Sequence, residues 1–315
     1  MISLARCGLA IGHATDHQGA TGCTVVRGLT EPFACGVCVP GRATGTRELA
    51  LLDPMQLVDR VDAILLTGGS AYGLDAAAGI MRWMEAKGRG FPVGGGVVPI
   101  VPAAAIFDLA PLGRFDARPT ADMAEAACAG AQPEVVEGSV GAGTGATVGK
   151  INGAELAMKG GLGAGVAQAG DVTVCAVAVV NALGDVHDGS GAIIAGARDR
   201  TGAWLDTARR LASPADERDF ADVAGRSTTL CVVSSNAALD RAQLAALARA
   251  SSAALFRRIT PVATQFDGDV IFATAPCTGG VRALPAQVEA LAVAALESAI
   301  ERAVRTRVPG DIFRG

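Results

Sequence analysis

The sequence predicts an α/β or α+β sandwich, and three observations lead to this fold class. Apolar β-branched runs alternate with amphipathic helical segments, most regularly in the second half of the chain. Half of the 315 residues are hydrophobic but only 4% are aromatic, so the core is expected to consist of Ala, Val, Leu and Ile. The 41 glycines follow no collagen-like period, which indicates many tight turns and close backbone approaches. The alternation alone is compatible with a doubly wound sheet or with two sheets flanked by helices.

The expected elements follow from local patterns of hydrophobicity and capping. Buried strands are predicted over residues 62–67, 164–169, 172–180, 228–235 and 269–275. Helices are predicted over residues 73–87, 120–130, 237–256 and 285–305. Ser70, after the glycine pair that ends the first of these strands, has the form of a helix N-cap.

Charge and hydropathy exclude several classes of function. The net charge is -4 and the basic residues are scattered, which argues against nucleic acid and anionic membranes as partners. Apolar runs end well short of the roughly 20 residues that span a bilayer, and no signal-peptide pattern opens the chain. We therefore expect a cytoplasmic protein. Its eight cysteines are expected to be small buried hydrophobic residues. Its three histidines have no cysteine or histidine partners at the spacing of metal ligands, so no metal or cofactor is expected.

Several polar residues emerge from apolar surroundings, and each has a structural and a functional interpretation. The glycine run before Lys150 lacks the spacing of a phosphate loop, but it places a lysine in an apolar region. Asn181 ends a valine-rich run and is either a turn residue or an oxyanion donor. Asp267-Gly268-Asp269 precedes a strand and is typical of a turn. Tyr72, in a strand-to-helix turn, is either a packing staple or a pocket wall.

The order of these motifs along the chain is more informative than any one of them. The five motifs are Thr147-Val148-Gly149-Lys150, Lys159-Gly160-Gly161-Leu162-Gly163, Val179-Val180-Asn181, Thr228-Thr229-Leu230 and Asp267-Gly268-Asp269. Together they resemble the DmpA-type (S58) peptidase family, which includes L-aminopeptidase/D-esterases, β-peptidyl aminopeptidases and nylon-oligomer endohydrolases. The resemblance also takes in three segments of the first half, and so it spans nearly the whole chain. They are Gly12-His13-Ala14-Thr15-Asp16, Pro40-Gly41 with Gly45-Thr46-Arg47-Glu48, and Leu66-Thr67-Gly68-Gly69-Ser70-Ala71-Tyr72-Gly73-Leu74-Asp75.

This resemblance implies a single domain with a helix–sheet–sheet–helix sandwich that cleaves its own chain. The scissile bond would be Ser227–Thr228, which gives fragments 1–227 and 228–315. Thr228 would then be the nucleophile at a new N-terminus. Asn181 would be the oxyanion donor.

The resemblance also implies the remaining polar residues of the site. Asp267 and Asp269 would form an orienting pair, and Lys150 matches the lysine of the nylon-hydrolase branch. A threonine hydroxyl needs an adjacent base, and the freed α-amino group of Thr228, with a reference pKa of roughly 7.7–8.0, suits that role at neutral pH. A nearby Lys150 ammonium would help to keep this amine unprotonated.

The sequence thus predicts a self-processing amide hydrolase that needs no cofactor. Its expected substrates are short peptides or ω-amino-acid oligomers of the nylon type, such as 6-aminohexanoate oligomers, and its expected assembly is a homo-oligomer of cleaved heterodimers, a tetramer or larger. Three alternatives stay open. They are an aminopeptidase/D-esterase of the same family, an acyltransferase resembling ornithine acetyltransferase, and an uncleaved binding protein without catalytic activity.

Overall fold

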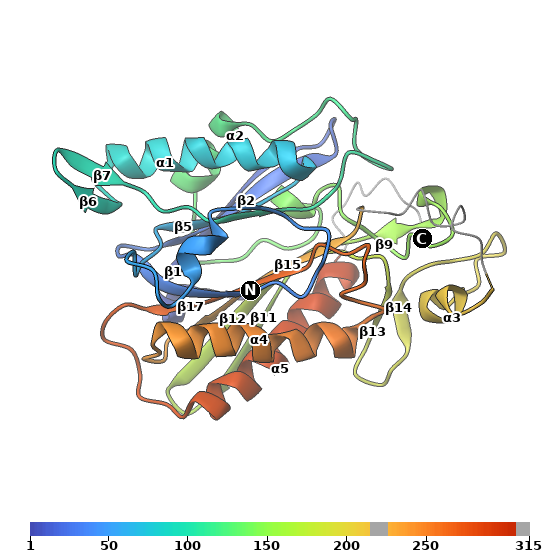
Figure 1. The fold of residues 1–315 in the computed structure, drawn as a ribbon. Helices are drawn as coiled ribbons and strands as arrows, with labels where there is room; N and C mark the ends of the chain where they lie inside the picture. Colours follow the sequence, from blue (N-terminus) through green and yellow to red (C-terminus); the bar gives the residue numbers. More distant parts are fainter. Residues whose placement is uncertain (215–225, 307–315) are drawn as a thin grey trace.

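Two five-stranded sheets pack face to face, and helices cover the outer face of each (Figure 1). The structure is a computed structural model that describes residues 1–214 and 226–306. The layers run α1 and α2, first sheet, second sheet, α4 and α5. The expected helix–sheet–sheet–helix sandwich is confirmed.

The first sheet has the strand order β1-β2-β5-β8-β4. Its strands, in chain order, are β1 (Leu9–Asp16), β2 (Thr21–Gly28), β4 (Gly45–Arg47), β5 (Ala63–Thr67) and β8 (Ala103–Ala105). The second sheet has the order β11-β12-β15-β17-β3. Its strands are β3 (Phe33–Cys38), β11 (Gly161–Ala169), β12 (Val172–Asn181), β15 (Thr228–Ser235) and β17 (Val270–Pro276).

Three smaller sheets lie outside the sandwich. They consist of β6 (Phe91–Val93) with β7 (Gly96–Val98), of β9 (Thr147–Val148) with β10 (Met158–Lys159), and of β13 (Asp185–His187) between β14 (Ile193–Ala195) and β16 (Ile259–Thr260).

The α-helices and short 3-10 helices begin and end as follows. The α-helices are α1 (Ala77–Ala86), α2 (Ala121–Ala129), α3 (Thr207–Leu211), α4 (Arg241–Arg258) and α5 (Pro285–Arg305). The 3-10 helices are η1 (Ala5–Cys7), η2 (Leu49–Leu52), η3 (Ser70–Ala76), η4 (Gly141–Gly143) and η5 (Ala154–Leu156). Within the described ranges, no helix is both long and apolar enough to cross a bilayer.

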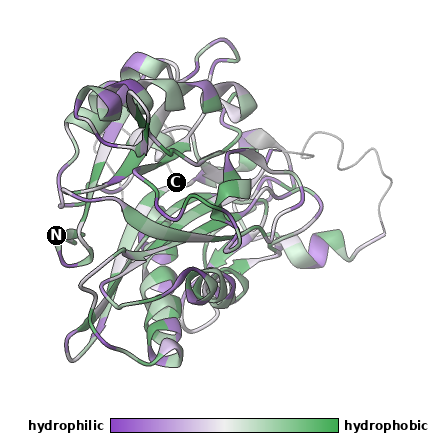
Figure 2. Cartoon of the chain, turned by 60° about the vertical axis from the view of Figure 1, so that its left-hand side comes forward, coloured by the Kyte–Doolittle hydropathy of each residue, from purple (hydrophilic) through white to green (hydrophobic). Residues whose placement is uncertain are grey.

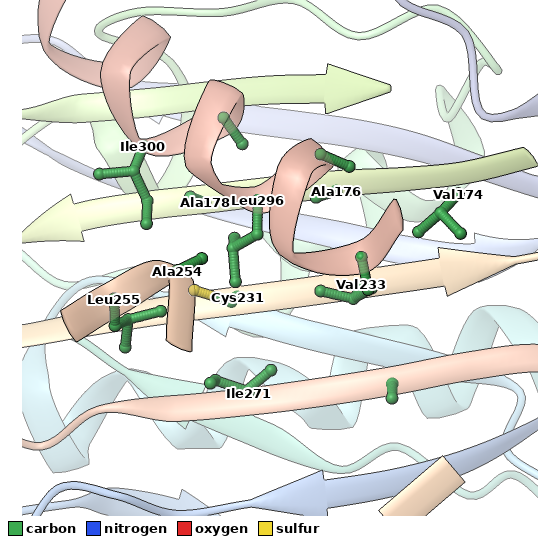
Figure 3. Close-up of a cluster of buried hydrophobic side chains, with 14 of the residues drawn as sticks. Val174, Ala176, Ala178, Cys231, Val233, Ala254, Leu255, Ile271, Leu296 and Ile300 are labelled. Atoms are coloured by element: carbon green, nitrogen blue, oxygen red, sulfur yellow. The ribbon is translucent and has the colours of Figure 1, made fainter. Parts of the chain in front are cut away.

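The second sheet is buried on both faces, which explains the unbroken apolar runs of its strands. In β15, Cys231 and Val233 pack beneath α4 and α5 (Figure 3). Their neighbours Leu230 and Val232 point the other way, into the layer between the two sheets. Because both faces need apolar side chains, the strand shows no alternation of polar and apolar residues. Hydrophobic residues accordingly concentrate in the interior of the molecule, and polar ones on the outer faces of its helices (Figure 2).

Glycines in β11 let α5 lie unusually close to the sheet. A Cβ at Gly163 would stand 2.2 Å from the carbonyl oxygen of Ala299, and one at Gly165 would stand 2.0 Å from that of Ala295. Both obstacles are helix backbone, which cannot rotate away. This close approach accounts for the glycine-rich sequence of β11.

The helix that follows β5 begins differently from the sequence expectation. Ser70 is not an N-cap: it is the first residue of the 3-10 helix η3, whose N-cap is Gly69, and its φ is 54°. The turn is held instead by distant segments, because the Ser70 N–H donates to the carbonyl of Ile106 and the Gly69 N–H donates to the Asp108 carboxylate. Regular α-helix begins only at Ala77.

Candidate active site

The ends of three neighbouring strands meet at one edge of the second sheet. In the antiparallel pair β12 and β15, the last residue of β12, Asn181, faces the first residue of β15, Thr228. β15 and β17 are parallel, and a bridge continues their pairing back to Ser227 and Asp267. Residues far apart in the sequence therefore converge because strand pairing fixes their register.

The peptide bond before Thr228 is presented to the hydroxyl of Thr228 itself. The Thr228 Oγ1 donates a hydrogen bond to the carbonyl oxygen of Ser227 at 2.6 Å. The same carbonyl accepts a second hydrogen bond from the Gly268 N–H at 2.8 Å. Thr228 is 3% exposed and Ser227 is fully buried, so little water competes for these groups.

Lys150 is buried beside Asn181. Its ammonium donates to the Asn181 carbonyl oxygen at 2.7 Å, to the Asn181 Oδ1 at 3.0 Å and to the Ala182 carbonyl oxygen at 3.4 Å. Burial lowers the pKa of Lys150 to about 7, although the negative charges of Asp267 and Asp269 act in the opposite direction. A lysine with this pKa exchanges its proton at neutral pH, as a group in acid–base catalysis must.

The side-chain amide of Asn181 is fully engaged. Its Oδ1 accepts from the Thr147 N–H at 3.0 Å, in addition to the Lys150 ammonium. Its Nδ2 donates to the Phe107 carbonyl at 3.1 Å and to the Arg226 carbonyl at 3.3 Å. These contacts fix which way the amide points, with one N–H group toward the Arg226 carbonyl, just before the scissile bond, and the other toward Phe107.

Asp267 and Asp269 are both buried and are held by short hydrogen bonds. Asp267 accepts from the N–H and the hydroxyl of Thr264, at 2.9 and 2.6 Å. Asp269 accepts from the N–H of Thr229 at 2.6 Å and from that of Ala263 at 3.1 Å. Burial raises the pKa of both carboxyl groups, and the charge of Asp267 raises that of Asp269 further. The pair thus places two carboxyl groups of raised pKa near a lysine of lowered pKa.

Five of the six side chains singled out from the sequence meet here, and the sixth lies apart. The five are Thr228, Lys150, Asn181, Asp267 and Asp269. Tyr72 is 54% exposed, and its ring lies beneath the guanidinium of Arg118, 3.5 Å from ring centroid to Cζ. It lines a surface cleft with Arg47 and Asp75.

Sequence reasoning missed three contributors to this region. Thr264 anchors Asp267 through its hydroxyl. A threonine three residues before an aspartate is a pattern from which this local hydrogen bond could have been predicted. The Gly268 N–H reaches the Ser227 carbonyl, and a backbone group gives no sequence signal. Asp108 follows Phe107, whose carbonyl accepts from Asn181; it accepts from the hydroxyl of Thr21 at 2.7 Å, and burial raises its pKa to about 6.

Among the residues that the structure describes, no group of three or more His, Cys, Asp or Glu side chains is placed to hold a metal ion. The side chains that meet at the site carry a hydroxyl, an amine, an amide and two carboxyl groups.

Comparison with known proteins identifies the family. A model of peptidase family S58 matches residues 7–308. The chain belongs to peptidase family S58. As a member of S58, it is an amide-bond hydrolase.

Relatives of this S58 peptidase include aminopeptidases and 6-aminohexanoate-oligomer endohydrolases. It is 42% identical over 301 residues to an uncharacterized aminopeptidase of Mycobacterium tuberculosis (strain ATCC 25618 / H37Rv), covering 88% of this chain and 81% of the relative. It is 29% identical over 306 residues to a 6-aminohexanoate-oligomer endohydrolase of Kocuria sp. (strain KY2), covering 93% of this chain and 81% of the relative.

Solved structures share the fold of this S58 peptidase at low identity. An L-aminopeptidase D-Ala-esterase/amidase from Ochrobactrum anthropi superimposes with a TM-score of 0.69 at 18% identity, covering 94% of this chain and 83% of that one. A β-aminopeptidase from Burkholderia sp. gives a TM-score of 0.68 at 19% identity, covering 94% and 84%. The Ochrobactrum structure is described as a variant of the Ntn-hydrolase fold, which is the fold that these likenesses show.

Proposed function

We propose that this S58 chain cleaves itself between Ser227 and Thr228 and then hydrolyses amide bonds with Thr228 as an N-terminal nucleophile. One observation carries the proposal: the buried Thr228 hydroxyl lies 2.6 Å from the carbonyl oxygen of the bond that it would attack. The products would be fragments 1–227 and 228–315.

Self-cleavage is an N-to-O acyl shift followed by hydrolysis. The Thr228 Oγ1 attacks the carbonyl carbon of Ser227, and its proton passes to a neighbouring base. Lys150 is the buried amine whose pKa, about 7, suits this task. As the tetrahedral intermediate collapses, the C–N bond breaks and the Thr228 nitrogen takes up the proton. Water then hydrolyses the ester, which gives the Ser227 carboxylate and restores the Thr228 hydroxyl.

Hydrolysis of a substrate repeats this chemistry with a new base. The freed α-amino group of Thr228 accepts the hydroxyl proton during attack and gives it to the leaving amine. A Lys150 ammonium nearby favours the neutral form of that amine. Asp267 and Asp269 compensate the ammonium charge, and Asp269 holds the start of β15 through the Thr229 N–H.

Short peptides and ω-amino-acid oligomers are the proposed substrates. Support comes from the names of the two groups of relatives, aminopeptidases and 6-aminohexanoate-oligomer endohydrolases. The motif resemblance of Lys150 and the two aspartates favours the endohydrolase branch. Overall identity is higher to an aminopeptidase, at 42%, than to an endohydrolase, at 29%. Release of free amine from aminoacyl anilides and from 6-aminohexanoate oligomers distinguishes these specificities.

Tyr72 is proposed to contact substrate from the cleft that it lines. The segment after β8 links the two places, because the Ile106 carbonyl anchors the Ser70 N–H and the next carbonyl, that of Phe107, accepts from Asn181. Replacing Tyr72 with Ala is expected to raise KM more than it lowers kcat. If the variant and the wild type have equal kcat and KM values, Tyr72 does not contact the substrate.

The proposed assembly is a homo-oligomer of cleaved heterodimers, a tetramer or larger. It rests on the family resemblance and on the Ala-rich helices, and light scattering after size exclusion measures it directly.

The test of the proposed function is a denaturing gel with N-terminal sequencing and an amide-hydrolysis assay. Wild-type protein is expected to give two fragments, the smaller beginning at Thr228. Thr228→Ala is expected to remain one chain without activity, and Thr228→Ser, which keeps a hydroxyl, is expected to cleave. Amide hydrolysis by Thr228→Ala would show that another residue is the nucleophile.

A further inference from the structure

Among the described residues, two groups donate hydrogen bonds to the carbonyl of the scissile bond, and one of these two can still donate after the attack. The Ser227 carbonyl oxygen accepts from the Thr228 hydroxyl at 2.6 Å and from the Gly268 N–H at 2.8 Å. When the Thr228 oxygen bonds to the carbonyl carbon, it gives up its proton and no longer donates. The Gly268 N–H stays within 2.7–3.1 Å or so of the oxygen on which negative charge develops, the range expected of an oxyanion donor.

The other donors near this carbonyl are committed elsewhere. A side-chain amide has two N–H groups, and those of Asn181 point at the carbonyls of Phe107 and Arg226. As a neutral amine, the form that can take up the Thr228 proton, Lys150 has two N–H groups. Three acceptor oxygens already lie within their reach, the two of Asn181 and the carbonyl of Ala182. In the uncleaved chain, neither group is free to receive charge on the Ser227 oxygen.

Glycine at position 268 makes this donor possible. A Cβ there would stand 2.6 Å from the carbonyl oxygen of Ala43 and 2.8 Å from the Thr228 Oγ1. The first obstacle is backbone and the second is the attacking oxygen. The residue that carries the N–H can approach the nucleophile this closely only without a side chain.

We propose that the backbone N–H of Gly268 is the oxyanion donor of self-cleavage, and that the Asn181 amide serves only substrate hydrolysis. The inference rests on the proposed self-processing. In the uncleaved chain the Arg226 carbonyl occupies one Asn181 N–H. Withdrawal of the new Arg226–Ser227 end releases that N–H for the carbonyl of an incoming substrate. Self-cleavage at Thr228 therefore uses the Gly268 N–H as its oxyanion donor, and the later hydrolysis of substrate uses the Asn181 amide.

An amide-to-ester replacement tests this directly. Glycolic acid in place of Gly268 removes one N–H and keeps the chain geometry. The rate of appearance of fragment 228–315 is expected to fall about 100-fold, the usual cost of one lost oxyanion donor. The matched control is glycolic acid in place of Gly130, whose N–H bonds only the carbonyls at the end of α2. If the Gly268 ester cleaves as fast as the Gly130 ester, the inference is wrong.

A second variant keeps the test decisive should the ester chain fold poorly. Asn181→Asp retains the oxygen that accepts from Lys150 and from the Thr147 N–H, and it removes the Nδ2 donor. With each rate taken at its own pH optimum, substrate hydrolysis is expected to fall roughly 100-fold or more and self-cleavage less than about 10-fold. Equal losses of both rates would overturn the separation of donors. A wild-type chain that never cleaves would instead refute the proposed function.

Discussion

Asn181 and Thr228 face each other as paired residues at the ends of antiparallel strands β12 and β15. This pairing places an amide and a hydroxyl side by side although 46 residues lie between them in the chain. The register of the hydrogen-bonded strands therefore also sets the geometry of the site. Four predictions follow from the contacts around this pair and from the packing that supports it.

The side chain of Ser227 is expected to be dispensable, because only its carbonyl takes part. Its hydroxyl is buried and has no hydrogen-bond partner among the described residues, which costs free energy of folding. Ser227→Ala should cleave within about threefold of the wild-type rate. In an uncleaved Thr228→Ala background it should leave the free energy of unfolding unchanged or raise it by about 1 kcal/mol. A chain that stops cleaving would show that the Ser227 hydroxyl has a role in the reaction.

Lys150 should make stability rise with pH above neutrality. Its pKa is about 7 in the folded state and roughly 10.4 when unfolded, so between these values the unfolded state binds more protons. The free energy of unfolding then increases with pH, by about 2 kcal/mol between pH 7 and 9. Below pH 7 both states are protonated and this contribution is flat.

Urea unfolding of uncleaved Thr228→Ala, with and without Lys150→Met, measures that slope. The rise is expected in the parent and not in the Lys150→Met variant. Lys87→Met, at an exposed position, is the control and should keep the rise. A parallel pH dependence in all three proteins would mean that Lys150 is charged throughout this range.

Thr264 is expected to tune Asp267. Its hydroxyl donates to the carboxylate at 2.6 Å, and hydrogen bonds from Thr264 hold down a pKa that burial raises. Thr264→Val removes this donor, so the pKa of Asp267 should rise and the acid limb of the pH–rate profile should move to higher pH. The loss in self-cleavage rate at pH 7 is expected to be about tenfold. Thr173→Val, which removes a buried hydroxyl without a partner, should leave the profile in place.

The packing of α5 against β11 should be intolerant of a single methyl group. A Cβ at Gly163 meets the backbone of Ala299 and Ala303 at 2.2 and 2.3 Å. Gly163→Ala must therefore push the helix outward, at a cost of about 1–3 kcal/mol in the free energy of unfolding. Gly94→Ala, where nothing lies within 4 Å, is the control and should change stability little. Equal stability of the two variants would contradict this packing.

Elements that depend on local sequence were predicted well, and those held by distant contacts were not. The run of β-branched residues gives β15 the same limits, 228–235, in sequence and structure, and α5 likewise spans 285–305. Ser70 misled because the turn at η3 is held by Ile106 and Asp108 rather than by its own hydroxyl. For the same reason, the partners of Lys150 could not be derived from its glycine-rich surroundings alone.

The resemblance to the family predicted the polar side chains of the site. The backbone groups that bind them could be identified only from the three-dimensional structure. The N–H groups of Gly268 and Ala263 complete the contacts of Ser227 and Asp269. Every residue except proline has such a group, so only the fold shows which ones point at the reacting atoms.

The strand order of the second sheet has a mechanical consequence for a cleaved molecule. Strands β15 and β17, which come from residues after 227, lie between β12 and β3, which come from residues before it. Breaking the Ser227–Thr228 bond thus produces two polypeptides interleaved within one sheet. Neither fragment can leave without breaking the hydrogen bonds between β12 and β15 and those between β17 and β3. Separation of the fragments therefore requires the sheet to unfold. Dilution alone should then never release a free subunit.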